Sequence, residues 1–187
     1  MTKTMSPMKV LASALAVFFM AAGLPCEVMA ATRQAIDADV KATLEHFYEE
    51  VRDGKKLVHD AKGALVFPAV FKAGIGIGAE YGEGALLVHG KAVDYYSTAA
   101  ASIGLQLGAQ KKSIVILFTQ EGALDKFRQS SGWKAGVDAS IAVITVGAGG
   151  EMDTAKLKEP ILGFIIGQKG LMYNLTLEGA KFTKLNK

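Results

Sequence analysis

Glycine stands at positions 74, 76, 78, 82 and 84, so that it alternates with other residues over a short segment. Each glycine forgoes side-chain packing and adds backbone entropy that folding must overcome, which makes such a run costly in any regular element. A chain tolerates the run where its backbone closely approaches another strand, a helix or a ligand. We therefore expect glycine-faced strands that pack tightly against a neighbour.

The first 30 residues are expected to form a secretory signal. Lys3 and Lys9 precede the short apolar run 10–22, and small residues close the segment at Ala30. This order is typical of a signal peptide cleaved after Ala30, and the apolar run is shorter than the roughly 20 residues of a spanning helix. The alternative is a lipoprotein signal acylated at Cys26, although a proline precedes this cysteine. We expect an exported protein that is periplasmic or associated with the envelope.

The remaining residues, 31–187, have the length of one domain and contain no cysteine. Disulfides, catalytic thiols and zinc–thiolate sites are therefore excluded for this part of the chain. The chain has a net charge of +3, and removing the two lysines and one glutamate of the first 30 residues lowers it only slightly. Such a small charge gives no indication of a nucleic-acid partner. The three histidines lack metal-ligand spacing, so neither a metal nor another cofactor is expected.

Residues 32–56 have the period of an amphipathic helix. Apolar residues recur at spacings of three or four, which places them along one face. Thr32 is positioned to cap the start of this helix, and Gly54 weakens its end. The apolar stripe consists of Ile36, Val40, Leu44, Phe47 and Val51.

After Gly63 the pattern changes to that of strands and turns. The expected strands are 64–67, which Pro68 ends, 74–81, 84–89, the end of 94–108, 113–119 and 135–146. A helix is expected over 120–130 and a loop over 147–150. The segments 161–166 and 171–177 are expected to form a closing hairpin. One helix followed by mostly adjacent strands favours an α+β domain. We expect a mainly antiparallel, strongly curved or barrel-like sheet with an N-terminal amphipathic helix and one or two further short helices.

Nucleotide binding and catalysis find little support in the motifs. The glycine run lacks the G-x-G-x-x-G spacing of a dinucleotide site. Ser102 lies in a weakened nucleophile motif, but no histidine follows it in the chain. Glu80 and Glu83 could act as paired carboxylates in a small hydrolase or glycosidase, although solvated charges beside a turn are the simpler explanation. We expect a protein that is not an enzyme and has no catalytic residues.

Trp133, the only tryptophan, lies beside a lysine between an expected helix and an expected strand. An amphipathic ring in this setting suits a membrane interface, and packing against the end of the helix is the alternative. Lys181, Lys184 and Lys187 make the C-terminal segment modestly basic, which suits either a surface patch or a solvated tail.

Several separated motifs resemble the SYLF domain, in the same order along the chain. They are Ala61-Lys62-Gly63, Val66-Phe67-Pro68, Lys72-Ala73-Gly74, Gly78, Tyr81-Gly82-Glu83-Gly84, Gly104-Leu105-Gln106-Leu107-Gly108-Ala109-Gln110, Ala123-Leu124-Asp125-Lys126-Phe127 and Lys169-Gly170-Leu171-Met172. The resemblance spans roughly residues 51–183. Eukaryotic members of this family bind phosphoinositides and, in some cases, actin, so the resemblance implies a lipid-binding module without enzymatic activity.

The resemblance also implies where lipid binds, because the amphipathic helix and nearby cations of the family meet anionic head groups. On this chain the implied lipid-binding residues are Arg52, Lys55, Lys56, Lys62 and Lys72. We expect residues 31–187 to form one SYLF-like domain that binds anionic phospholipid or phosphoinositide at a membrane surface, with its protein partner unknown. The alternative is a structural envelope module or a protein-interaction module, with an actin-like partner, that does not contact lipid.

Overall fold

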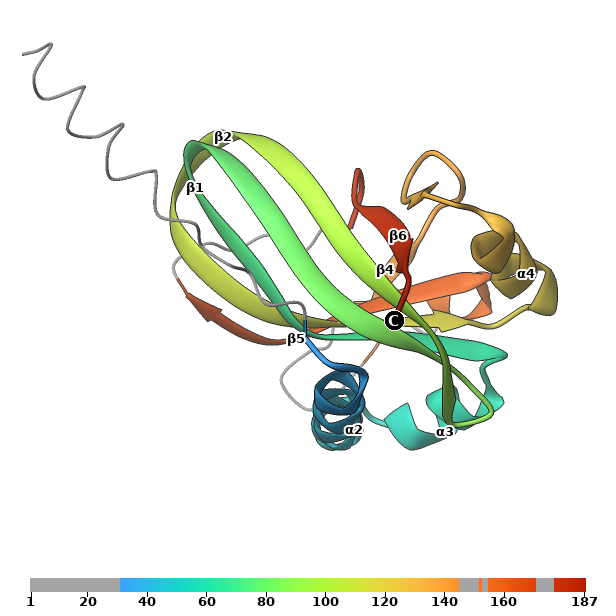
Figure 1. Cartoon of the computed structure of the whole chain (residues 1–187). Helices are drawn as coiled ribbons and strands as arrows, with labels where there is room; N and C mark the ends of the chain where they lie inside the picture. Colours follow the sequence, from blue (N-terminus) through green and yellow to red (C-terminus); the bar gives the residue numbers. More distant parts are fainter. Residues whose placement is uncertain (1–30, 145–151, 153–154, 171–176) are drawn as a thin grey trace, which may run out of the picture. The chain divides into compact units, whose positions relative to one another are not determined.

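The computed structural model describes residues 31–144, 152, 155–170 and 177–187, and residues 31–187 group into one compact unit. The expected signal segment with Cys26, the loop 147–150 and residues 171–176 of the expected closing hairpin lie outside the described residues. Six strands of the described part form one sheet, and every strand pairing except β4 with β5 is antiparallel. The expected α+β class with a mainly antiparallel, strongly curved sheet is confirmed (Figure 1).

Helix α2 (Arg33–Glu50) carries the expected apolar stripe. The Thr32 side chain caps the helix by accepting a hydrogen bond of 3.3 Å from the backbone N–H of Ala35. All five stripe residues are buried, with exposed fractions between 0% and 8%. The capping residue and the buried face of this helix were therefore predicted correctly.

The expected single helix over 32–56 is wrong, because the chain forms two helices there. Asp53 has φ of 59°, in the left-handed region, and the short helix α3 (Gly54–Asp60) begins directly after it. Glycine suits position 54, because a Cβ there would lie 3.1 Å from the Phe47 ring and 3.2 Å from the Phe47 carbonyl oxygen, so that these neighbours would have to shift by a few tenths of an ångström. The break turns α3 back toward the end of α2.

Strands β1 (Gly63–Val88) and β2 (Lys91–Phe118) form one long antiparallel ribbon, which curls in Figure 1. They are joined at His89 and Gly90, both with positive φ. The expected division of this region into separate short strands, with a turn at 82–83, is wrong. Pro68 lies at a register shift inside β1 rather than at a strand end, and a second shift separates Ile75 from Ile77. Such bulges bend a strand without ending it.

The glycine run lets β1 pack against itself. A Cβ on Gly84 would lie 2.1 Å from the Val66 carbonyl oxygen, and one on Gly82 would lie 2.7 Å from the Ala69 carbonyl oxygen. Both distances are far below an ordinary carbon–oxygen contact, so the two halves of β1 approach backbone to backbone. The expectation of glycine-faced packing is confirmed, and the neighbour is the other half of the same strand.

The remaining elements extend the ribbon on both sides. Helix α4 (Glu121–Gln129) matches the helix expected over 120–130. Strands β5 (Ile161–Gly170) and β6 (Lys181–Leu185) pair with the two halves of β2. At the outer edges, β4 (Ala142–Ile144) pairs with β5 and β3 (Trp133–Lys134) pairs with β6. The 3₁₀ helix η1 (Lys156–Lys158) precedes β5. The strand expected over 135–146 forms only at residues 142–144, as β4, because Gly136, with φ of 82°, turns the chain after β3; residues 145–146 lie outside the described residues.

The sheet is apolar on both faces, because alternate residues of its strands point in opposite directions. One face packs with α4 and β6, and its buried residues include Leu65, Phe67, Ile114, Ile116, Phe118, Leu124, Phe127, Trp133 and Phe182. The other face packs under α2, and its buried residues include Ala64, Val66, Ala85, Val115, Leu117, Leu162, Phe164 and Ile166. Within the described ranges, none of the helices combines the length and apolar character that crossing a bilayer requires.

Candidate lipid-binding site

Four of the five cations implied as lipid-binding residues lie on or beside α3. Arg52 precedes the helix, Lys55 and Lys56 stand in its first turn, and Lys62 follows it, directly before β1. All four side chains are exposed. The segment 52–62 therefore presents cations that a ligand can reach.

The fifth implied cation, Lys72, lies elsewhere and is only 5% exposed. Its cross-strand partner is Gln110, which points to the same face of β2 as the buried residues Ile114 and Ile116. Beside this pair, Lys112 forms an ion pair of 3.0 Å with Glu80. The structure thus buries Lys72 among polar residues on the α4 side of the sheet. The expectation that it meets lipid head groups at the surface does not hold in this structure.

Trp133 is also buried, with an exposed fraction of 4%. Its ring lies 5.7 Å from the rings of both Phe127 and Phe182, measured between centroids. This is the packing alternative, in which the ring rests against α4. A membrane-interface role is contradicted by this position because the ring does not face the surface.

The two carboxylates considered as a catalytic pair each have their own partner. Glu80 is paired with Lys112, as described above, and Glu83 lies 2.9 Å from the Lys187 ammonium group. Glu83 also accepts a hydrogen bond of 2.9 Å from the Tyr81 hydroxyl group, and burial together with Glu83 raises the pKa of Tyr81. Both carboxylates thus act in contacts that hold the ribbon and the C-terminus.

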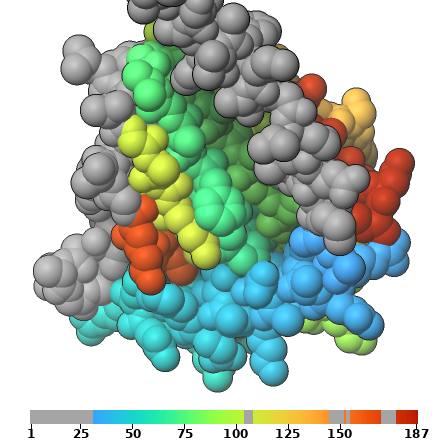
Figure 2. Space-filling model, turned by 60° about the vertical axis from the view of Figure 1, so that its left-hand side comes forward, coloured from blue at the N-terminus to red at the C-terminus, as the bar shows by residue number. Residues whose placement is uncertain are grey.

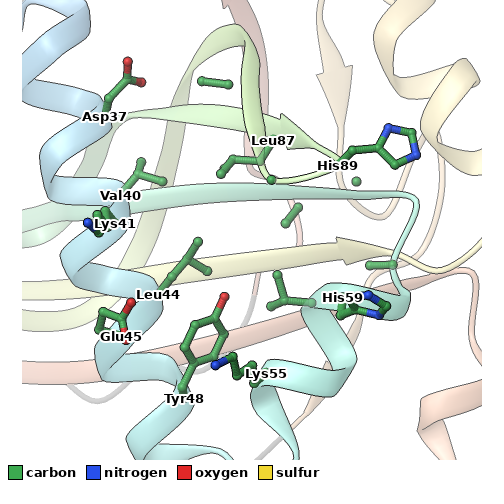
Figure 3. A pocket seen from close by; sticks show the side chains of 16 residues that line it. Asp37, Val40, Lys41, Leu44, Glu45, Tyr48, Lys55, His59, Leu87 and His89 are labelled. Atoms are coloured by element: carbon green, nitrogen blue, oxygen red, sulfur yellow. The ribbon is translucent and has the colours of Figure 1, made fainter.

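A groove of about 820 Å³ opens next to the segment 52–62, between the two helices and the end of the ribbon. Figure 3 shows side chains of α2 on one side of this groove, with Lys55 and His59 of α3 and Leu87 and His89 of the ribbon around the rest. The break at Asp53 creates the groove, because it places α3 beside α2 instead of continuing it. Lys55 is the one implied lipid-binding residue that lines it.

The floor of the groove is apolar and its rim is polar. Val40 and Leu44 of α2 are buried there, and Val58 and Leu87 are half-buried. The polar rim consists of Asp37, Lys41, Glu45, Tyr48, Lys55, His59 and His89. A floor and rim of this kind suit a ligand with an apolar body and a polar end.

The acids of the rim are partly engaged by tyrosines. The Tyr95 hydroxyl group donates to both carboxylate oxygens of Asp37, at 3.0 and 3.1 Å, and burial and this contact raise the pKa of Tyr95. Burial, followed by the charge of Glu45, raises the pKa of Tyr48. Among the described residues no carboxylate lies within ion-pair distance of Lys41 or Lys55. These two ammonium groups are therefore the ones that an anionic ligand can reach without breaking an ion pair.

Sequence reasoning did not identify Lys41, His59 or His89 as parts of a site. Lys41 neighbours a stripe residue, His59 ends α3 and His89 forms the hairpin turn, and only the fold brings them to one groove. No group of three or more histidine, cysteine, aspartate or glutamate side chains within the described ranges is arranged to hold a metal ion.

Comparison with known proteins identifies the family. Residues 99–187 match the family Ysc84, described as "Las17-binding protein actin regulator". No match to a curated protein was found. The matched range begins within β2 and runs to the end of the chain, whereas the groove is built from residues 37–92. The SYLF resemblance found in the sequence is thereby confirmed over residues 99–187, which match the Ysc84 (SYLF) family.

Proposed function

We propose that residues 31–187 bind an anionic phospholipid at a membrane surface, in an exported or envelope-associated protein. The observation that carries this proposal is the groove beside α3, whose apolar floor is bordered by Lys41 and Lys55. The match of residues 99–187 to a family described as a Las17-binding actin regulator supports a binding role.

The groove matches the two chemical parts of a phospholipid. The half-buried Val58 and Leu87, which pack against the cluster of the buried Val40 and Leu44, offer an apolar surface along which an acyl chain can lie. Lys41 and Lys55 stand at the rim, where each can donate hydrogen bonds to phosphate oxygens. A volume of about 820 Å³ falls within the ordinary range of small-molecule sites.

The exposed cations beside the groove add attraction to an anionic surface. A lysine near such a surface contributes about 1 kcal/mol to the free energy of binding. Salt screens this attraction at distances beyond the Debye length of about 10 Å. Acidic residues of the same region, such as Asp37, Glu45 and Asp53, limit the attraction. The proposal therefore requires binding that is moderate in strength and sensitive to salt.

A protein partner is the second candidate, because the matched family is described as an actin regulator that binds Las17. In that case the same exposed cations would meet acidic side chains of a protein. The two candidates differ in whether vesicles without protein suffice for binding.

Flotation of the full chain with vesicles tests the proposal. The variant Lys55→Glu/Lys56→Glu is compared with Lys156→Glu/Lys158→Glu, which changes two exposed lysines of η1 by the same charge. Both variants keep residues 1–30, so any contribution of that segment cancels. We expect preference for anionic over neutral vesicles, and the α3 variant should lose about 2 kcal/mol of binding free energy, or more than about tenfold in affinity. Equal binding to neutral vesicles, or equal losses in the two variants, would contradict the proposal.

A further inference from the structure

An exposed apolar surface lies on the curled part of the β1–β2 ribbon, away from the groove. We call it the arch face. Its most exposed residues are isoleucines, with exposed fractions of 81% for Ile75, 68% for Ile77 and 87% for Ile103. The arch face consists of Phe71, Ala73, Ile75, Ile77, Ala79 and Tyr81 of β1 together with Ala99, Ala101, Ile103 and Ala109 of β2.

The strand register makes these residues neighbours. Ile77 pairs with Ile103 and Tyr81 pairs with Ala99, and residues two apart on a strand point to the same face. Figure 2 shows side chains of the first half of β1 in green beside those of β2 in yellow on one face of the molecule, next to α2 in blue. The arch face is thus one continuous surface and not a set of scattered apolar residues.

The arch face continues the face of the sheet that α2 covers. On β2, Val115 and Leu117 lie beneath α2, while Lys111 and Ala109 follow on the same side at steps of two residues and are exposed. Within the described residues, no helix or strand covers this continuation. Contiguous apolar surface of this kind is uncommon on a monomeric protein and marks a contact with a partner or a membrane.

The charges around the arch face indicate an anionic bilayer as the partner. The arch face itself contains no carboxylate. At one border the exposed residues Lys111 and Lys169 pair across neighbouring strands, and the Lys111 ammonium group lies 5.6 Å from the Phe71 ring centroid. At the other border Glu83 is paired with Lys187. Anionic lipid supplies the charge opposite to this lysine pair, which a second copy of the same face does not.

The aromatic residues fit the same partner. Phe71 and Tyr81 stand at the two ends of the β1 part of the arch face, with exposed fractions of 59% and 44%. Aromatic rings at the borders of an apolar surface are typical of side chains in the head-group region of a membrane. We infer that the arch face is a bilayer-docking surface, whose isoleucines enter the interfacial layer of an anionic membrane while Lys111 and Lys169 meet its phosphates. This inference rests on the proposed lipid binding.

Docking through the arch face must be shallow. The free edge of β1 has no strand partner among the described residues, and its backbone N–H and C=O groups need water, which the hydrocarbon core lacks.

The arch face is also distant from the groove along the ribbon. Tyr81 is the arch-face residue of β1 nearest to the groove in sequence, and Leu87 lies six residues after it, which corresponds to about 20 Å along a strand. Changes in one surface can therefore be made without touching the other.

Fluorescent labels at single cysteines test the docking surface. In the full chain carrying Cys26→Ser, which then has no other thiol, an environment-sensitive dye is attached at Ile103→Cys or, as a matched control, at Val137→Cys. Val137 is also highly exposed, at 75%, but lies in the turn between β3 and β4. With vesicles of phosphatidylglycerol and phosphatidylcholine, the dye at position 103 should shift to the blue and be quenched by lipid-borne quenchers, whereas the dye at position 137 should remain in water.

The variant Ile77→Thr/Ile103→Thr provides a second readout, because threonine keeps the β-branched shape that suits a strand. We expect its vesicle affinity to fall by about tenfold or more, which corresponds to about 1.4 kcal/mol, with an unchanged thermal midpoint. The matched variant Val93→Thr/Val137→Thr should bind like the parent.

The outcomes separate this inference from the proposed function. If the chain binds anionic vesicles in a manner sensitive to Lys55→Glu/Lys56→Glu while the dye at position 103 stays in water, the docking surface is refuted and the proposed function stands. If the chain binds no vesicles, both are refuted. If the dye at position 103 shifts without vesicles as protein concentration rises, the arch face binds a second copy of the chain and the inference is overturned.

Discussion

The substitution Gly84→Ala tests the close packing of β1 against itself. The added methyl group would lie 2.1 Å from the Val66 carbonyl oxygen and 2.8 Å from Cδ1 of Phe67. An ordinary carbon–oxygen contact is about 3.3 Å or longer, so the two halves of β1 would have to separate by about an ångström. Neither neighbour is the end of a flexible side chain, and the strain therefore cannot be relieved by a rotamer change.

The expected loss of stability follows from this overlap. Overpacking of a well-packed interior costs about 1–3 kcal/mol and occasionally more, while replacing glycine by alanine lowers the entropy of the unfolded chain by up to about 1 kcal/mol. We expect a net loss of about 2 kcal/mol in the free energy of unfolding. For a domain of this size, the thermal midpoint should fall by about 4–8 °C.

Circular dichroism during thermal and urea unfolding measures this change. The matched control is Gly122→Ala in α4, where an added methyl group meets nothing within 4 Å and helix propensity should raise stability by about 0.5–1 kcal/mol. If Gly84→Ala unfolds within about 0.5 kcal/mol of the parent, the two halves of β1 do not pack as described.

Three further predictions concern buried side chains. Lys112→Met should lower the free energy of unfolding by about 3–5 kcal/mol, because it leaves the buried Glu80 carboxylate without its ion-pair partner. In the same urea titrations, Lys111→Met at the exposed neighbouring position should change the free energy of unfolding little. Burial, followed by the charge of Asp94, raises the pKa of Tyr96 to about 12. The stability that the protonated Tyr96 contributes should be complete below about pH 10 and be lost between about pH 10 and 12, because only the unfolded chain releases the proton in that range. The variant Tyr96→Phe should lose less stability over this range, and a decline equal to that of the parent would contradict the assignment. Because Trp133 is only 4% exposed, its emission should be poorly quenched by acrylamide and should not shift when anionic vesicles are added, and a blue shift on adding vesicles would show that the ring reaches the membrane.

The parts of the fold that follow from local periodicity could be predicted from the sequence. The spacing of Ile36, Val40 and Leu44 placed them on one helical face, and α2 buries exactly that face against the sheet. The short helix α4 was predicted for the same reason, through Leu124 and Phe127. Such patterns depend on residues close in sequence, and the structure adds only the surface against which they pack.

Long-range contacts explain where the sequence prediction failed. Pro68 and the glycines of β1 resemble strand ends, because proline and glycine ordinarily interrupt strands. Here Pro68 lies at a bulge, and Gly82 and Gly84 face the first half of the same strand. No local pattern distinguishes a glycine that ends a strand from one that allows two strand segments to touch.

The candidate site was predicted only in part for a similar reason. Lys55 lies at the groove because the chain breaks at Asp53, and the Asp53-Gly54 pair indicates an interruption in the sequence but not the direction in which α3 continues. Lys72 resembles a surface cation in sequence, but its pairing with Gln110 places it on the α4 side of the sheet, where it is buried. Alternation along β1 did not indicate this, because Val70 and Phe71 are both apolar and only the structure shows that Val70, on the side of Lys72, is buried while Phe71 is exposed.

Nuclear magnetic resonance of the isotope-labelled full chain, titrated with a short-chain anionic phospholipid below its micelle concentration, tests the central claim most directly. Lipid binding in the groove should shift the amide and methyl resonances of Val40, Leu44, Val58 and Leu87, which line it, and Lys55→Glu should weaken these shifts. The neutral lipid with the same acyl chains should produce smaller shifts at the same concentration. Absence of shifts at these residues, or equal shifts with both lipids, would contradict the claim that this groove binds anionic phospholipid.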